Sequence, residues 1–298
     1  MVNDAHCHFF SSTFFGALDH QLGPAAQGGP EAVCRRLQWD APGEPETLAD
    51  RWVAELDAHG VARAVLIASV PGDEGSVSVA VRRHPTRLVG FLMVDPSTPD
   101  AVERTTHALT ELGLRGVCLF PAMHHVRLDD TRLQHVVDAA ARVAGATVFI
   151  HCGALSVGVR QKLGLPSRFD LRLGNPLGVA RLAQAHTHTT FVIPHFGAGL
   201  LREALMAADA APNIVLDTSS SNSWIRYEPG LTLSAVFDAA LRVVGPSRLL
   251  FGTDSSFFPR GWQRAVLEQQ RAALHACQVG EHEQALIFGG NFERLFPG

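Results

Sequence analysis

Short apolar runs recur along the chain, separated by stretches with helical periodicity. The runs are continuous rather than alternating, which is typical of strands buried on both faces of a parallel sheet. They predict eight strands, at residues 2–8, 62–68, 87–94, 115–120, 146–151, 190–194, 213–217 and 248–251.

The stretches between these runs carry apolar residues near the 3.6-residue helical period. Leu48, Trp52 and Leu56 show this pattern in the first stretch, and Gly60 ends it. The predicted helices span residues 47–59, 73–84, 99–112, 129–144, 176–185, 200–210, 231–244 and 261–277. Eight strand–helix units in 298 residues predict an α/β fold, a (β/α)8 TIM barrel forming a single domain over residues 1–298. A doubly wound open sheet is the alternative, but no G-x-G-x-x-G follows the first strand.

Two long stretches interrupt the strand–helix rhythm, and we expect them to be long loops after strands 1 and 5. Residues 9–46 are rich in Gly, Pro and Phe, and residues 152–175 form the second loop. Four phenylalanines make residues 9–46 too apolar for a plain linker. This stretch is interpreted either as a loop packed on the barrel or as a lid insertion over a site, and the two interpretations are compatible.

Composition excludes several classes of function. A net charge of -4 and a pI near 6.4 argue against nucleic acid or an anionic membrane surface as a partner. No apolar stretch reaches the length of a membrane span, and Asp4 with the following histidines interrupts the region where a signal peptide would be apolar. The five scattered cysteines, with no C-x-x-C, indicate reduced thiols in a cytoplasmic protein.

Polar residues gather at the ends of four predicted strands. His6 and His8 lie two apart in a strand, so they face one side while the cysteine between them faces the other. His151, His195 and Asp254 follow strands 5, 6 and 8. The carboxyl ends of barrel strands are where barrel enzymes assemble their sites. Each residue alone is more often structural, but together they predict a divalent metal site in the mouth of the barrel.

These motifs resemble those of the amidohydrolase superfamily. The resemblance lies in D-x-H-x-H on strand 1, one histidine after each of strands 5 and 6, and G-T-D after strand 8. Within the superfamily the chain is similar to the amidohydrolase-related branch, which includes aminocarboxymuconate-semialdehyde decarboxylase and pyrone dicarboxylate lactonase. The runs PLGVARLAQAHTHTTFVIPHFGAG and IFGGNFERLF support the same branch.

The resemblance implies a ligand set, a catalytic base and an oligomeric state. One divalent metal, Zn²⁺ or alternatively Mn²⁺, would be held by His6, His8, His151 and Asp254. His195 would act as general base or polarise a carbonyl, and Asp254 could also accept a proton. Binuclear members use a carboxylated lysine after strand 4, where this chain has phenylalanine and proline, so a single metal is expected. The branch also implies a homodimer.

Several loop residues are weaker candidates for substrate binding. His124 and its neighbour His125 follow strand 4. They are interpreted either as a solvated pair or as a substrate contact. The loops of the presumed active face also carry four cationic residues, any one of which could bind a substrate carboxylate. They are Arg160, Lys162, Arg226 and Arg260. We predict that the substrate-binding residues are Arg226, Arg260 and His124. The alternative for each is that it is an ordinary surface residue.

Two reactions suit this constellation. The first is hydrolysis of a small, carboxylated lactone, ester or amide through a metal-activated water. The second is metal-dependent, non-oxidative decarboxylation of an aromatic or unsaturated carboxylic acid. The His-Cys-Gly sequence at residues 151–153 favours hydrolysis, because decarboxylases of the branch often have His-Pro there. A TatD-type nuclease, a PHP-type phosphatase and a catalytically silent binding protein are less favoured alternatives.

Overall fold

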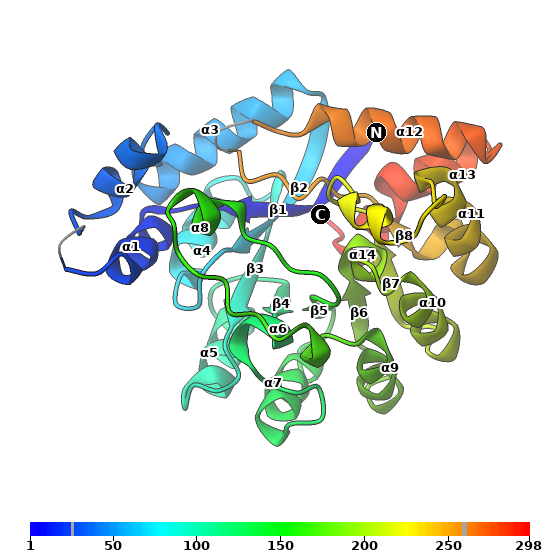
Figure 1. The fold of residues 1–298 in the computed structure, drawn as a ribbon, viewed down its shortest axis with the longest axis horizontal. Coiled ribbons are helices and arrows are strands. Elements are labelled where there is room, and N and C mark those ends of the chain that lie inside the picture. Colours follow the sequence, from blue (N-terminus) through cyan, green and yellow to red (C-terminus); the bar gives the residue numbers. More distant parts are fainter. Residues whose placement is uncertain (25–26, 258–260) are drawn as a thin grey trace.

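Eight parallel strands form the centre of the molecule (Figure 1). The computed structural model describes residues 1–24, 27–257 and 261–298. The strands pair in sequence order. They are β1 Val2–Phe9, β2 Val61–Ala68, β3 Leu88–Val94, β4 Gly116–Leu119, β5 Thr147–Ile150, β6 Thr190–Ile193, β7 Ile214–Asp217 and β8 Leu249–Leu250. This order confirms the predicted (β/α)8 TIM barrel.

The last strand is very short, so the barrel closes through the backbone that follows it. Ala5 N donates to Phe251 O at 2.9 Å, Asp254 N to His6 O at 2.8 Å, and His8 N to Ser255 O at 2.7 Å. The ladder between β1 and this segment places the histidine pair directly beside Asp254.

Helices surround the barrel, as Figure 1 shows. One main helix follows each strand, and these helices are α3 Pro45–Ala58, α4 Glu74–Arg83, α5 Ala101–Thr110, α7 Thr131–Ala141, α9 Pro176–Ala185, α10 Leu201–Ala210, α11 Leu233–Val244 and α12 Arg264–Ala276. Local sequence fixes several of their first turns. Asp130, Asn175 and Thr232, for example, cap α7, α9 and α11 by accepting hydrogen bonds from backbone N–H groups.

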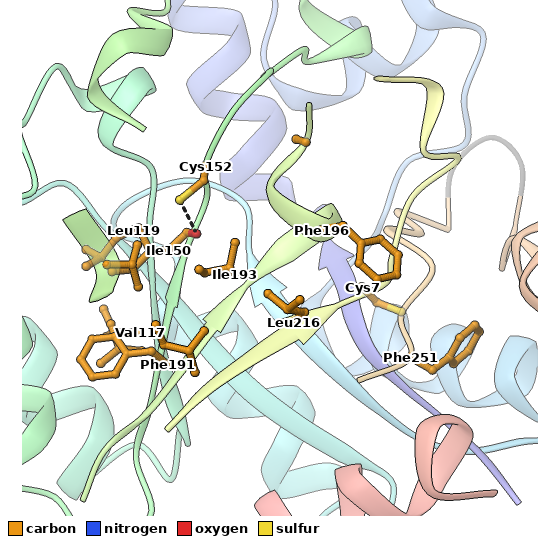
Figure 2. Close-up of a cluster of buried hydrophobic side chains, with 14 of the residues drawn as sticks. Cys7, Val117, Leu119, Ile150, Cys152, Phe191, Ile193, Phe196, Leu216 and Phe251 are labelled. Carbon is orange, nitrogen blue, oxygen red and sulfur yellow. Dashed lines mark hydrogen bonds between the residues drawn. The ribbon is translucent and has the colours of Figure 1, made fainter. Parts of the chain in front are cut away.

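The hydrophobic core has two layers, one on each face of the barrel. Along β3, Leu88 and Leu92 pack outward against the helices, whereas Val89, Phe91 and Met93 fill the barrel interior. Figure 2 shows part of the outer layer. Because both faces of each strand are buried, the strands have the continuous apolar sequences from which they were predicted.

Cysteine side chains next to the metal-ligand candidates belong to the outer layer. Cys7 and Cys152 are fully buried among apolar residues in Figure 2, and the Cys152 thiol donates to Ile150 O at 3.6 Å. All five cysteines are free, as predicted from their spacing. No helix among the described residues is long and apolar enough to cross a membrane.

The prediction of two irregular loops was only partly right. Residues 9–46 contain α1 Ser12–Gln21 and α2 Pro30–Leu37, and residues 152–175 contain α8 Gly158–Lys162 and the short turn η1 Leu171–Leu173. These helices are too short to give a sustained periodic pattern. They are stabilised by tertiary packing, and in α1 by Ser11, whose side chain accepts from Phe14 N at 3.2 Å.

The two insertions pack on each other to form what we call the cap cluster (Figure 1). Its buried members come from α1, α2 and the α8 region, and they are Phe14, Phe15, Leu18, Val33, Cys34, Leu37, Val159 and Leu163. Arg160 Nη1 also donates to Gln21 Oε1 at 2.5 Å, which ties α8 to α1. The apolar character of residues 9–46 thus serves a small second core at the mouth of the barrel.

Short elements complete the chain. They are α6 Pro121–His124, η2 Pro194–Gly197, η3 Ser223–Tyr227, η4 Pro246–Arg248, α13 Glu281–Ala285, the π-helical turn η5 Leu286–Gly290 and α14 Asn291–Leu295. The last of these places Phe292 in the inner core, together with Phe296 just beyond it. Arg63 holds that end in place by donating to Phe296 O at 2.6 Å.

Gly90 in β3 leads to a prediction about packing. A Cβ atom at Gly90 would lie 2.5 Å from Leu114 and 2.8 Å from Val77, whereas one at Gly75 in α4 would meet nothing within 4 Å. We expect Gly90→Ala to destabilise the fold by about 1–3 kcal/mol through overpacking. The matched control Gly75→Ala should be neutral or stabilise by up to about 1 kcal/mol. Thermal unfolding measures both, and equal midpoints for the two variants would contradict this packing.

Candidate metal centre

Three side chains converge at the seam where the barrel closes. His6 and His8 extend from β1, and Asp254 follows β8. Asp254 Oδ1 lies 3.1 Å from His8 Nε2 and 3.6 Å from His6 Nε2. These three ligand atoms all lie within 4.8 Å of one another. The structure therefore brings together three of the four residues predicted to hold the metal.

Hydrogen bonds fix which ring nitrogens face this point. His6 Nδ1 lies 2.7 Å from Asp217 Oδ2, and because a carboxylate only accepts, Nδ1 carries the proton. His8 Nδ1 lies 3.1 Å from the Ser69 hydroxyl, which already donates to Ile67 O, so Nδ1 is again the donor. In the neutral form of each ring, Nε2 therefore carries the lone pair, and it points toward Asp254. Support of this kind is typical of histidines that bind metals.

The resulting group of electron-rich atoms fits a divalent cation. Two nitrogen lone pairs and a carboxylate oxygen repel one another unless a proton or a metal ion lies between them. Burial acts to raise the pKa of Asp254, but the neighbouring histidines His8, His6 and His195 outweigh burial and hold it below its usual range, so the carboxylate is ionised. Imidazole nitrogen with carboxylate oxygen is a donor set that suits Zn²⁺ and related transition ions.

His151 lies in the same cavity, beside His195. Its ring centroid is 5.2 Å from that of His195, and it stacks on Phe120 at 5.3 Å. Burial and the neighbouring histidines hold its pKa well below the usual range, and its buried Nδ1 has no hydrogen-bond partner. A neutral imidazole with a free nitrogen is what a metal ligand requires, but His151 does not belong to the tight group of three. Its role as fourth ligand stays a prediction.

His195 is held beside His6 by a serine. The two rings stack at 5.0 Å, and Ser219 Oγ lies 2.9 Å from the Nδ1 atoms of both. His6, His195 and Asp217 form a second group of close ligand atoms among the described residues. Because His6 Nδ1 already donates to Asp217, we interpret this second group as hydrogen-bonded support. It orients His195, whose ring lines the cavity.

The backbone at two of the candidate residues is left-handed. His195 has a φ of 55° and Asp254 a φ of 60°, and every residue from 195 to 199 has positive φ. Such conformations are costly for residues other than glycine and concentrate at functional sites. The turn after β6 also requires Gly153, where a Cβ atom would lie 2.1 Å from Gly197 O.

Asp4 has a structural role in the seam. Its carboxylate accepts from His6 N at 2.9 Å, Thr253 N at 3.1 Å and Trp262 Nε1 at 2.6 Å. Burial raises its pKa, and these hydrogen bonds oppose that rise. Asp4 therefore ties β1 to the segment that carries Asp254.

A large cavity of about 1190 Å³ opens over this group. Its walls include every predicted metal ligand together with His195 and Arg226. The cavity wall contains His125, not the predicted His124, which is half-buried beside Phe120. Arg260 lies outside the described residues. The substrate-binding roles of these residues stay predictions.

Comparison with known families shows the family to which the chain belongs. A family model described as amidohydrolase matches residues 4–298. The chain belongs to the amidohydrolase family. The resemblance predicted from the strand-end motifs is thereby confirmed. Among curated proteins, none matches this amidohydrolase.

Several solved structures are similar to this amidohydrolase. A probable 2-pyrone-4,6-dicarboxylic acid hydrolase from Acinetobacter baumannii is 17% identical, with 100% of this chain and 99% of that one covered and a TM-score of 0.60. An amidohydrolase from Burkholderia multivorans with bound zinc is 16% identical, with 99% of this chain and 98% of that one covered and a TM-score of 0.60. A 5-carboxyvanillate decarboxylase from Novosphingobium aromaticivorans with bound manganese is 14% identical, with 99% of this chain and 97% of that one covered and a TM-score of 0.65. At these identities the likeness shows the fold.

Sequence reasoning missed the side chains that orient the histidines of this amidohydrolase. Asp217 ends a predicted strand at the same rim as the other site residues, so its position was a usable signal. Ser69 and Ser219 gave none, because a serine in a loop is common and only the folded chain places its hydroxyl beside a histidine.

The convergence of three ligand atoms predicts the metal content of this amidohydrolase. We expect one divalent ion per chain in the purified protein. Asp254→Asn keeps the size of the side chain and tolerates the left-handed backbone, but it removes the negative charge. We expect it to weaken metal affinity more than about 100-fold, which exceeds the loss usual for a residue that only supports a ligand. Elemental analysis and chelator competition measure this, with His124→Ala as a control that keeps its metal. Full metal content in Asp254→Asn would refute the assignment.

Asp217 gives a second prediction. In Asp217→Asn the charge that raises the basicity of His6 is lost, and metal affinity should fall by about 10–100-fold. The control is Asp238→Asn, which changes an exposed carboxylate paired with Arg242 on α11. Competition with a chromophoric chelator compares the two, and equal affinities would exclude a supporting role for Asp217.

Proposed function

We propose that this protein is a metal-dependent hydrolase that acts on a small, carboxylated lactone, ester or amide by means of an activated water. The observation that carries the proposal is the convergence of His6 Nε2, His8 Nε2 and Asp254 Oδ1 in the mouth of the barrel. The zinc and manganese in two structures of similar fold support a divalent cation at this position.

The cation would be Zn²⁺, with Mn²⁺ as the alternative. His6, His8 and Asp254 would hold it, and His151 would be the fourth ligand. Such an ion supplies Lewis-acid polarisation of a substrate oxygen and lowers the pKa of water toward neutrality. The open cavity over the group leaves room for both water and substrate.

His195 is suited to move a proton in this reaction. Burial lowers its pKa, so the imidazole is neutral near pH 7 and can accept a proton. Its Nδ1 is engaged by Ser219 Oγ at 2.9 Å, so Nε2 is the nitrogen free for a proton from the attacking water. The same ring can then return that proton to the leaving group.

The charge of the cavity wall favours an acidic substrate. Among the described residues that line the cavity, Asp254 is the only acidic one. Four cationic side chains share that wall, namely Arg160, Lys162, Arg168 and Arg226. A carboxylate away from the reacting carbonyl would be attracted into the cavity and held there by such groups.

A decarboxylase is the second candidate, and one observation favours it. Phe120, which stacks on His151, lines the cavity together with Met93 and Met123 of the same hydrophobic cluster. An apolar surface of this kind suits the ring of an aromatic carboxylic acid, the substrate of the alternative reaction.

The experiment supplies zinc-loaded protein with carboxylated lactones, esters and amides, and in parallel with aromatic carboxylic acids. We expect hydrolysis with incorporation of oxygen from isotopically labelled water, and its loss after chelation. His195→Gln should retain its metal but lose about 10²–10⁴-fold in kcat, the usual contribution of a general base. Release of CO₂ from the aromatic acids without water incorporation would instead establish the decarboxylase.

A further inference from the structure

A row of aromatic rings leads away from the metal centre along one wall of the cavity. The ring of Phe10 lies 6.1 Å from that of His8, and Phe14 stacks on Phe10 at 4.0 Å. Behind them, Phe15 contacts Phe14 at 5.2 Å and Trp39 at 6.2 Å. Phe10, Phe14 and Trp39 line the cavity, whereas Phe15 is fully buried. The row begins at a metal-ligand candidate, and the buried ring of Phe15 joins Phe14 to Trp39 behind the cavity wall.

A single cation stands at the far end of this row. Lys162 Nζ lies 5.2 Å from the centre of the Trp39 ring, and the residue is exposed at the cavity wall. It is the only lysine in the sequence. In the part of the chain that the structure describes, no carboxylate forms an ion pair with it. An ammonium held over an aromatic face keeps its N–H groups available for an anion.

The neighbouring Arg160 is already committed to structure. Its Nη1 donates to Gln21 at 2.5 Å and its Nη2 to Pro166 O at 2.6 Å. The bond to Gln21 braces α8 against α1, the bond to Pro166 fixes the loop after α8, and these insertions also share the cap cluster. The position of Lys162 relative to Trp39 is thus fixed by a packed core and not by a loose loop.

The cavity is much larger than the proposed reaction needs. A volume of about 1190 Å³ exceeds the usual range of about 300–1,000 Å³ for pockets that enclose drug-sized ligands. A small lactone at the metal centre would leave the aromatic row uncovered. Phe10 and Trp39 are half-buried and Phe14 is 6% exposed, so Phe10 and Trp39 offer most of the apolar area, with a cation beside Trp39.

We propose that Phe10, Phe14, Trp39 and Lys162 form a distal subsite that binds the remote half of an elongated acid. The apolar middle of the ligand lies along the rings, and its terminal carboxylate meets Lys162, while the reacting end lies at His6, His8 and Asp254. This inference rests on the proposed function only for the identity of the reacting end. The substrate class it names is an extended, apolar acid with negative groups at both ends.

The first test uses biphenyl-4,4′-dicarboxylate as the probe, with biphenyl-4-carboxylate and benzoate for comparison. We expect calorimetry on the metal-loaded protein to show that the dicarboxylate binds about fivefold more tightly than the monocarboxylate, the upper range for a partly exposed ion pair. Benzoate, which is too short to cover the row, should bind more weakly than either. In Lys162→Met the two biphenyl acids should bind equally, whereas Trp39→Leu should weaken both.

A second readout uses the single lysine directly. Lys162 carries the only side-chain primary amine, so an amine-selective acetylating reagent targets it and the terminal amine, and peptide mass spectrometry follows each. The dicarboxylate should slow acetylation of Lys162 severalfold and leave the terminal amine unaffected. The control variant is Arg202→Met, which removes an exposed cation on α10 that does not line the cavity. It should bind both biphenyl acids as the wild type does.

The outcomes separate this proposal from the proposed function. Equal binding of the two biphenyl acids to the wild type, or an unchanged preference in Lys162→Met, overturns the distal subsite even if small carboxylated substrates are still hydrolysed. If the dicarboxylate protects Lys162 but the protein binds no metal or hydrolyses no substrate, the subsite is supported. The missing metal or turnover then counts only against the function proposed for the metal centre.

Discussion

The hydrogen bond from Asp254 N to His6 O, 2.8 Å long, is the contact on which the site depends. It belongs to the seam where a strand of only two residues leaves closure of the barrel to irregular backbone. Asp4 reinforces the seam from β1 by accepting from Thr253 and Trp262. Because the seam sets the backbone on both sides, it determines how closely the carboxylate approaches the two imidazoles. The group of acceptors is therefore a result of how the barrel closes.

Such a group is unfavourable on its own, and the surrounding residues keep it in place. Asp217 and Ser69 hold the protons of the two β1 histidines on Nδ1, and Ser219 links His6 to His195. The left-handed backbone at residues 195 and 254 adds further strain. The buried scaffold beneath, with Phe149 packed edge-on against His6 at 4.9 Å, gives the rings little room to turn away. Strain and repulsion retained in this way are what a preorganised cation site requires.

Much of this was predictable from the sequence, because the strongest constraints are periodic. Continuous apolar runs indicated the strands, and the two-residue spacing of His6 and His8 put both on the cavity side. The helices α1 and α2 were missed because short helices depend on tertiary contacts that periodicity does not reveal. Which of His124 and His125 lines the cavity depends on a left-handed turn at His125, with a φ of 55°, and no local sequence pattern predicts that turn. The supporting serines were invisible for a similar reason.

The arrangement of the seam also has a consequence for biosynthesis. β1 is made first, and β2 is available to pair with it after some sixty residues. The other edge of β1 finds its partner only when residues 251–255 have been made. During translation the two histidines therefore remain on an open sheet edge until some 250 residues have been made. Contacts this distant in sequence form late, so the three converging atoms can capture an ion together only after Asp254 has been made.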